Sequence, residues 1–231
     1  MGSPGRTTPA KMLRKLSMTE VSEIQMTNTL TPGLPPTEVA SILEAQLRAE
    51  GALLSGHFKL SSGLHSDTYV QCARFLRKPE LAAPAMAVLA KRLRDAGITP
   101  DVVVGPAMGG VVVSYELARQ LGVPSLFTER DANGEMILRR GFTLAPGDRV
   151  VIAEDVVTTG KSTLEVARVL QAMGVEVLAV ASLIDRTNGA AQLPFPNFAL
   201  LPVRAAVFAA DAVPQHLAGI PAVKPGSRPD A

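Results

Sequence analysis

Short apolar runs alternate along this chain with longer segments in which apolar side chains recur every three or four positions. The short runs predict strands and the longer segments predict helices, because side chains repeat every two residues in a strand and about every 3.6 residues in a helix. Strands are expected at 57–60, 67–71, 102–104, 125–128, 150–153 and 175–184. Helices are expected at 79–95, 111–121, 162–173 and 214–218, preceded by one that starts at the N-cap Thr37 and stops at Gly51. This alternation predicts an α/β fold with a mostly parallel, doubly wound sheet.

One stretch, residues 149–163, joins a strand to a helix through polar residues. Its apolar segment 150–153 is typical of a strand buried on both faces of a parallel sheet. Glu154 and Asp155 follow at the C-terminal end of that strand, where open α/β sheets bind ligands. Thr158-Thr159-Gly160 then precedes a helix, whose N-terminus presents free N–H groups and a positive dipole end. The stretch therefore indicates an anion site beside two carboxylates.

Two other interpretations of this stretch fit its residues less well. Gly160-Lys161-Ser162 resembles the end of the nucleotide-binding P-loop G-x-x-x-x-G-K-[ST]. That pattern requires a glycine five residues before Gly160, but Asp155 stands there and would face the phosphates, so this interpretation is poor. An ordinary strand–turn–helix joint without a ligand is the other alternative, and two acids followed by Thr-Thr-Gly make it unfavourable.

A second loop, Gly105-Pro106-Ala107-Met108-Gly109-Gly110, also stands between an apolar strand and a helix. Glycines let backbone amides approach an anion closely. The alternative is a tight turn that merely requires glycine. Since the C-terminal ends of parallel strands meet at one edge of a sheet, both loops are expected to converge there.

Composition narrows the possible partners and compartments. The formal net charge of the 231 residues is only +2, and no long basic stripe is present, so nucleic-acid binding is disfavoured. No apolar run reaches the ~18 residues that a membrane helix requires. The single cysteine, Cys72, excludes an intramolecular disulfide and fits a reducing cytoplasm. The spacing of His57, His65 and His216 suits neither a shared metal nor a catalytic triad.

The stretch 150–162 resembles the phosphoribosyl pyrophosphate (PRPP) motif of type I phosphoribosyltransferases, whose core is Rossmann-like. The resemblance implies that the two acids hold the ribose hydroxyls and that the Thr-Thr-Gly turn cradles the 5′-phosphate. These roles suit a diol that donates hydrogen bonds and a phosphate that only accepts them. The implied PRPP-binding residues are Glu154, Asp155, Val156, Val157, Thr158, Thr159, Gly160, Lys161 and Ser162. The implied pyrophosphate loop, often with an unusual cis peptide, contains Ala107, Met108, Gly109 and Gly110.

Flanking motifs indicate the base. Residues 56–71 resemble the N-terminal hood motif of orotate phosphoribosyltransferases, 182–186 their orotate-contacting strand end, and 129–142 a mobile loop of one bacterial and archaeal branch. The resemblance spans about residues 37 to 226 and implies transfer of phosphoribose from PRPP to orotate, a step of pyrimidine synthesis. Thr158 and Arg186 are the implied orotate contacts. Asp155 and Glu154 are the implied catalytic acids, and Arg130 is hypothesised to contact pyrophosphate.

This chain departs from the family pattern at its cations. Ser61 stands where many members have a lysine in the hood turn, and Met108-Gly109 stands where many have an aromatic residue and a lysine. The mobile loop lacks the usual Lys-x-x-Lys-x-His pattern, and its cations are Arg130, Arg139 and Arg140. The pyrophosphate contacts are therefore expected to be redistributed, and Lys161 has no assigned role.

Composition, residue pattern and the resemblance together imply an organisation and partners. Residues 1–35 are expected to be a disordered extension, 36–78 the hood, 79–203 the core, and 204–231 a segment that packs near the hood and ends in disorder. Mg²⁺ is expected to arrive with PRPP and to have no protein ligands. A cytoplasmic homodimer with shared active sites is implied. A purine phosphoribosyltransferase, and a non-catalytic regulator that senses PRPP and binds nucleic acid, are the competing functions.

Overall fold

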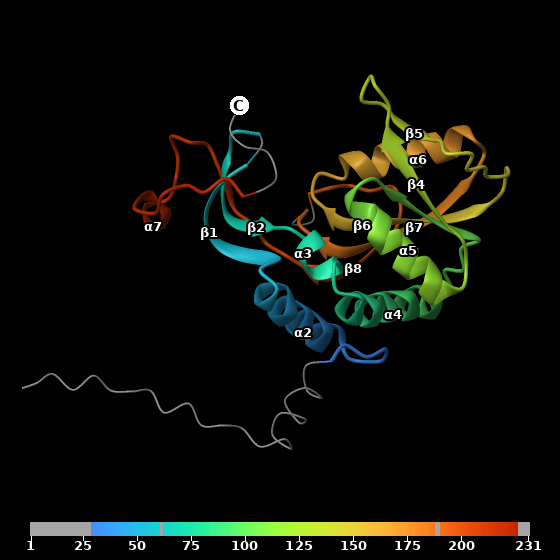
Figure 1. Cartoon of the computed structure of the whole chain (residues 1–231), viewed down its shortest axis with the longest axis horizontal. Helices are drawn as coiled ribbons and strands as arrows, with labels where there is room; N and C mark the ends of the chain where they lie inside the picture. Colours follow the sequence, from blue (N-terminus) through green and yellow to red (C-terminus); the bar gives the residue numbers. More distant parts are fainter. Residues whose placement is uncertain (1–28, 61, 188–189, 226–231) are drawn as a thin grey trace, which may run out of the picture.

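The structure, a computed structural model, describes residues 29–60, 62–187 and 190–225. Figure 1 shows a large α/β unit with a smaller β unit beside it. Most of the extension expected at 1–35, together with Ser61 and the disorder expected at the end of the chain, lies outside the described residues. Within that extension, Leu30 is only 2% exposed and packs in the core, so packing reaches further toward the N-terminus than the boundary predicted at residue 35.

The larger sheet has six strands in the order β5-β4-β3-β6-β7-β8. All neighbouring strands pair in parallel except the antiparallel β4–β5 pair. The strands are β3 (Val102–Pro106), β4 (Ser125–Arg130), β5 (Met136–Leu138), β6 (Arg149–Val157), β7 (Glu176–Asp185) and β8 (Asn197–Pro202). The predicted α/β fold with a mostly parallel sheet is confirmed.

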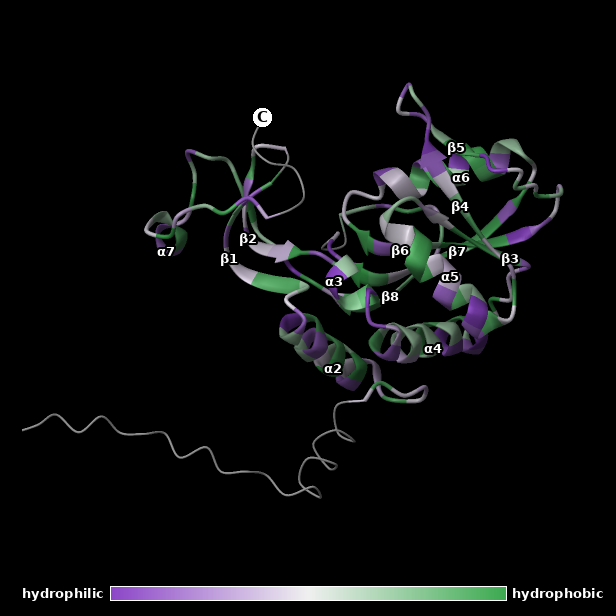
Figure 2. Ribbon diagram, in the orientation of Figure 1, coloured by the Kyte–Doolittle hydropathy of each residue, from purple (hydrophilic) through white to green (hydrophobic). Residues whose placement is uncertain are grey.

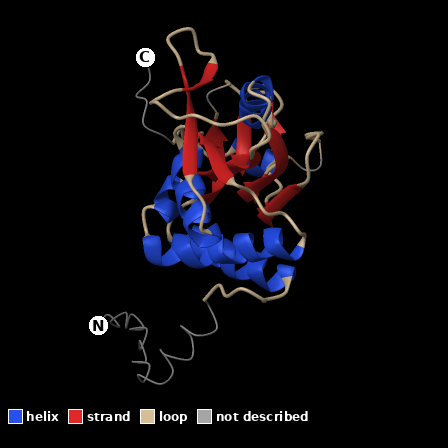
Figure 3. Cartoon of the chain, turned by 90° about the vertical axis from the view of Figure 1, so that its right-hand side faces the viewer, coloured by secondary structure: helices blue, strands red, loops and turns tan. Residues whose placement is uncertain are grey.

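Helices cover both faces of this sheet (Figure 3). One face packs against α2 (Pro36–Ala49), α4 (Pro79–Asp95) and α5 (Gly109–Leu121), and the other against α6 (Lys161–Ala172). Along β6, Val151 and Ala153 belong to the hydrophobic cluster on the α2, α4 and α5 side, whereas Val150 and Ile152 belong to the cluster that includes α6. Figure 2 shows the resulting concentration of hydrophobic positions in the central strands. A strand buried on both faces explains the unbroken apolar run of 150–153.

The smaller sheet joins the N-terminal hairpin to the C-terminal segment. Its strands, in the order β1-β2-β9, are β1 (Leu53–Lys59), β2 (His65–Val70) and β9 (Val207–Phe208). The Val223 amide donates to the His57 carbonyl at 2.9 Å, and His57 Nδ1 donates to the Ile220 carbonyl at 2.7 Å. The short helices α7 (Gln215–Ala218) and α3 (Ala73–Leu76) complete the described fold.

Several local predictions need correction. The N-cap of α2 is Pro35 and not Thr37, because the helix already includes Pro36, whose fixed φ suits the first helical turn. Helix α3 and strands β8 and β9 were not predicted, because they are short or lie in a proline-rich region. Within the described ranges, no helix combines the length and apolar character that crossing a membrane requires.

Candidate active site

The two acids at the end of β6 lie on opposite faces of the sheet. Strand residues alternate between faces, so Glu154 follows Ile152 toward α6 and Asp155 follows Ala153 toward α5. The contacts agree: Glu154 bonds to side chains of α6, and Asp155 adjoins Gly109 at the start of α5. The sequence-adjacent carboxylates therefore have different surroundings.

Glu154 is buried beneath the N-terminus of α6. Its side chain accepts hydrogen bonds from the Ser162 hydroxyl at 2.8 Å and the Thr163 hydroxyl at 3.2 Å, both at Oε1. Burial is the main cause that raises the pKa of Glu154 from its ordinary value of 4.5 to about 7, while the two hydroxyls act in the opposite direction. The two hydrogen bonds anchor the N-terminus of α6 to strand β6.

We expect Glu154 to make stability depend on pH. A folded-state pKa of about 7, above 4.5, means that the folded protein binds the proton more tightly than the unfolded chain. This stabilisation is fully present below about pH 4.5 and is lost as the pH rises through about 7, a loss of about 3 kcal/mol. Glu154→Gln lacks the titrating proton, so its free energy of unfolding should not fall with pH for this reason. Urea unfolding of both proteins between about pH 5 and 8 should therefore show the variant becoming more stable relative to the parent by about 3 kcal/mol as the pH rises. Parallel pH profiles for the two proteins would contradict the expectation.

Asp155 touches the glycine-rich loop. A Cβ atom added to Gly109 would lie 2.5 Å from Oδ1 of Asp155, so only glycine fits beside this carboxylate without a shift. Oδ1 also accepts a hydrogen bond from the Val156 amide at 2.8 Å. Burial raises the pKa of Asp155, and the backbone hydrogen bonds oppose that rise. The structure thus brings together the two segments that the sequence predicted to converge.

The glycine-rich loop packs tightly against the sheet. A Cβ at Gly110 would meet the Ala153 carbonyl at 2.7 Å, and one at Gly105 would collide with the Gly110 carbonyl. The Ala107–Met108 peptide bond is cis, as the resemblance implied. Met108 itself is 84% exposed. The glycines therefore serve close backbone packing and bring the loop against Asp155.

The Thr-rich turn leaves the N-terminus of α6 open. Thr158 and Thr159 are exposed, and Gly160 adopts a left-handed φ of 74° as the N-cap without a side-chain capping bond. A left-handed N-cap favours glycine. The Lys161 amide donates to Thr159 Oγ1 at 3.4 Å, and first-turn amides without such a partner form a ready anion site. Lys161 is largely exposed, and its Nζ atom lies 3.9 Å from Oε1 of Glu165 on the same helix.

Arg186 extends from the end of β7 beside this turn. Its backbone amide donates to the Val157 carbonyl at 2.8 Å, which holds the end of β7 next to β6. Its Nε atom is buried and has no hydrogen-bond partner in the described part of the chain. Burial lowers the pKa of this guanidinium, and the charge of Asp67 opposes that effect. An unpartnered buried donor suits an acceptor supplied by a ligand.

The three loop cations are all paired with carboxylates. Arg130 donates to Glu165 at 2.5 Å and to the Gly134 carbonyl at 2.6 Å. Arg139 and Arg140 both pair with Glu129, which lowers the pKa of that carboxyl. These pairs fold the β4–β5 hairpin onto itself and onto α6.

A cavity of about 540 Å³ opens beside Asp155, Met108 and Gly109. Its other wall comes from the β1–β2 hairpin and the residues in and next to α3, and it includes Tyr69, Gln71 and Arg77. Gln71 and Arg77 were not singled out from the sequence, because no local pattern places them opposite Asp155. Cys72 also lines the cavity, and burial raises the pKa of its thiol.

Comparison with known proteins identifies the family. Residues 72–195 match the model of the phosphoribosyl transferase domain. The orotate phosphoribosyltransferase of Carboxydothermus hydrogenoformans is 50% identical over 177 residues, covering 77% of this chain and 92% of the relative. That of Desulforamulus reducens is 51% identical over 178 residues, with the same coverage of 77% and 92%. The crystal structure of the Aeropyrum pernix enzyme aligns with a TM-score of 0.56 at 28% identity, over 69% of this chain and 93% of that one. This chain belongs to the orotate phosphoribosyltransferase family.

Proposed function

We propose that this chain transfers the phosphoribosyl group of PRPP to N1 of orotate, giving orotidine 5′-phosphate and pyrophosphate. The bond from C1 of the ribose to the pyrophosphate oxygen breaks with its electron pair on the oxygen, N1 of orotate forms the new bond, and the N1 proton is lost. The observation that carries the proposal is the contact between Asp155 and the Gly109 backbone. It places an acid suited to a ribose diol against a loop suited to pyrophosphate.

Each of the loops and side chains described above then has a proposed place along PRPP. The open N-terminus of α6 and the turn 158–160 bind the 5′-phosphate, and Asp155 with Glu154 orients the ribose hydroxyls. Backbone amides of 107–110 face the pyrophosphate. Arg186, through its buried unpartnered Nε, and Thr158 bind orotate, an anionic planar base.

Catalysis in this scheme needs no covalent nucleophile. A ribosyl transition state resembles an oxocarbenium ion, so positioning and charge stabilisation lower the barrier. Asp155 contributes negative charge near the ribose. Closure of the hairpin loop 129–142 would exclude water that could hydrolyse PRPP. Arg130 would then release the Glu165 carboxylate and bind the pyrophosphate.

Mg²⁺ is proposed to enter with PRPP. The described residues contain no group of three or more His, Cys, Asp or Glu side chains arranged to hold a metal ion. Mg²⁺ prefers oxygen ligands and retains water, so the diphosphate and ribose oxygens are suitable donors. When bound, the ion would neutralise charge on the leaving pyrophosphate, while Asp155 orients the diol.

A homodimer is proposed because an apolar face borders the cavity. Met108, Val112 and Tyr115 are 84%, 45% and 67% exposed, and their spacing places them on one side of α5. The family resemblance implies that the 129–142 loop of a second copy reaches the site. The lone, buried Cys72 is compatible with the proposed cytoplasmic location.

An orotate-consumption assay tests the proposed function. The full chain is mixed with PRPP and orotate, with and without Mg²⁺, and loss of orotate absorbance is followed. Orotate consumption that requires Mg²⁺ is expected. Consumption of adenine, guanine or xanthine in place of orotate would reject the choice of base. Retained PRPP binding and tight RNA or DNA binding, without turnover of any base, would favour a regulator.

A further inference from the structure

The cavity beside Asp155 contains one cationic side chain among the described residues that line it. That side chain is Arg77, at the C-terminal end of α3, and Asp155 is the only other charged residue in the lining. The glycine-rich loop on the opposite wall has no cation between Gly105 and Gly110. A pyrophosphate placed against that loop would therefore meet amides on one side and this guanidinium on the other.

Arg77 is held loosely enough to turn toward a ligand. Its Nε donates to the Arg74 carbonyl at 3.0 Å, and its Nη2 reaches Glu50 at the long distance of 3.5 Å. Within the described chain, Nη1 has no hydrogen-bond partner, and the side chain is 63% exposed. Glu50 keeps a closer partner, Lys78 at 2.8 Å, so departure of Arg77 would not leave this carboxylate unpaired. Breaking an exposed, long ion pair of this kind costs little free energy.

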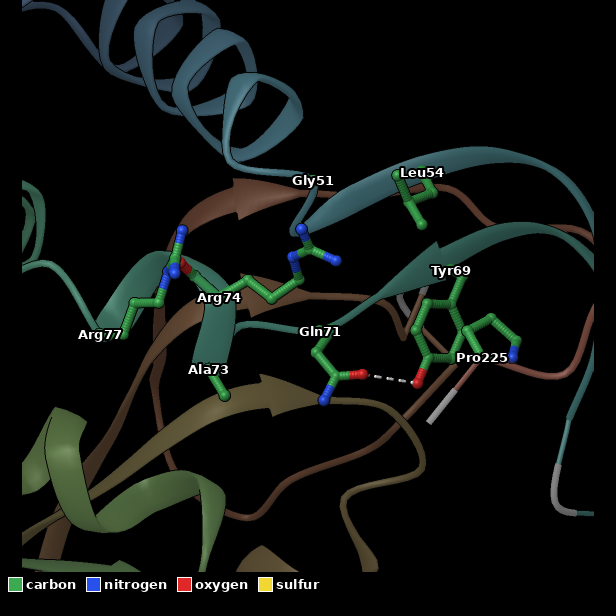
Figure 4. Close-up of a pocket in the computed structure, with 8 residues that line it drawn as sticks. All are labelled: Gly51, Leu54, Tyr69, Gln71, Ala73, Arg74, Arg77 and Pro225. Atoms are coloured by element: carbon green, nitrogen blue, oxygen red, sulfur yellow. Dashed lines mark hydrogen bonds between the residues drawn. The ribbon is translucent and has the colours of Figure 1, made fainter. Parts of the chain in front are cut away.

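The neighbouring Arg74 provides a contrast on the same short helix. Figure 4 shows its guanidinium directed toward Gly51, and its Nε donates to the Glu50 carbonyl at 3.1 Å. Arg74 lines a second cavity of about 520 Å³ but not the cavity beside Asp155, whereas Arg77, Tyr69 and Gln71 line both. Arg77 thus lies where the second cavity meets the cavity beside Asp155.

We propose that the Arg77 guanidinium binds the diphosphate group of PRPP and the released pyrophosphate, supplying from α3 the positive charge that the glycine-rich loop lacks. A guanidinium presents two parallel N–H donors that match phosphate oxygens. The inference rests on the proposed function and deepens it, because it assigns a further binding residue to the same site.

The test compares the binding of Mg-pyrophosphate and ribose 5-phosphate to the full chain by calorimetry. Arg77→Ala should weaken pyrophosphate binding about tenfold or more, the loss of one hydrogen-bonded ion pair. Ribose 5-phosphate lacks the diphosphate, so its affinity should not change. Arg77→Lys, which keeps the charge but not the two-pronged geometry, should give a smaller loss. Arg74→Ala is the matched control and should bind both ligands as the parent does.

Unchanged pyrophosphate affinity in Arg77→Ala would overturn the inference. So would an equal loss in Arg74→Ala, or an equal loss of ribose 5-phosphate binding, since either would indicate a general disturbance of α3. These outcomes differ from failure of the proposed function. In that case the parent protein itself would not consume orotate with Mg-PRPP.

Discussion

Asp155→Asn should lower kcat/KM for PRPP by about 100-fold while leaving the fold intact. The substitution keeps the size of the side chain but removes the charge that accepts hydrogen bonds from the ribose diol. Hydrogen bonds to a charged group contribute about 1.5–3 kcal/mol, and each 1.4 kcal/mol corresponds to about tenfold. Initial rates of orotate consumption at varied PRPP concentration measure the effect.

Asp101→Asn is the control for this substitution. Asp101 pairs with Arg149 at 2.8 Å, at the opposite end of β6 from Asp155. This exposed acid lies away from the cavity, so its loss should leave kcat/KM unchanged. If Asp155→Asn were as active as the parent, the assignment of the ribose site to this strand end would be wrong.

Gly109→Ala should reduce activity at least about tenfold by a steric route. The new methyl group would lie within 3 Å of the Asp155 carboxylate, so the loop or the acid must move. Inserting a methyl group into a packed site costs about 1–3 kcal/mol. We expect a higher PRPP dissociation constant and a lower thermal stability, because the loop and strand pack together in the free protein.

Gly219→Ala is the matched control for the added methyl group. Gly219 has no heavy atom within 4 Å of a Cβ position and a φ of −87°, which any residue adopts. Its replacement should change stability by less than about 0.5 kcal/mol and leave PRPP binding unaltered. Normal PRPP affinity in Gly109→Ala would show that the Asp155–Gly109 contact is not needed for binding.

Much of the core could be predicted from local pattern. The buried run 150–153 and the helix at 79–95 correspond to the centre of β6 and to α4 (Pro79–Asp95). These elements have long apolar repeats and clear stops. The glycine-rich and Thr-rich turns follow adjacent parallel strands, β3 and β6, so their meeting at one edge follows from topology.

Other features depend on contacts between distant residues. Strand β8 lies in a proline-rich region and is stabilised by parallel pairing with β7, which no local pattern reports. The opposite orientations of Glu154 and Asp155 follow from strand alternation, but the bonds of Glu154 to Ser162 and Thr163 require the helix to be in place. Arg77 lines the cavity at the end of α3, a short helix that contacts α5 and that no local pattern predicted. The sequence resemblance instead directed attention to Arg130, whose contribution stays a prediction.

The pairing of β9 with β2 has a consequence for how the protein is made. The six strands of the larger sheet are complete once Pro202 has left the ribosome, but the early hairpin β1–β2 still lacks its third strand. A two-stranded hairpin alone is marginally stable in water. The β1–β2 hairpin, although translated early, is therefore expected to gain its third strand only after the final segment of the chain emerges.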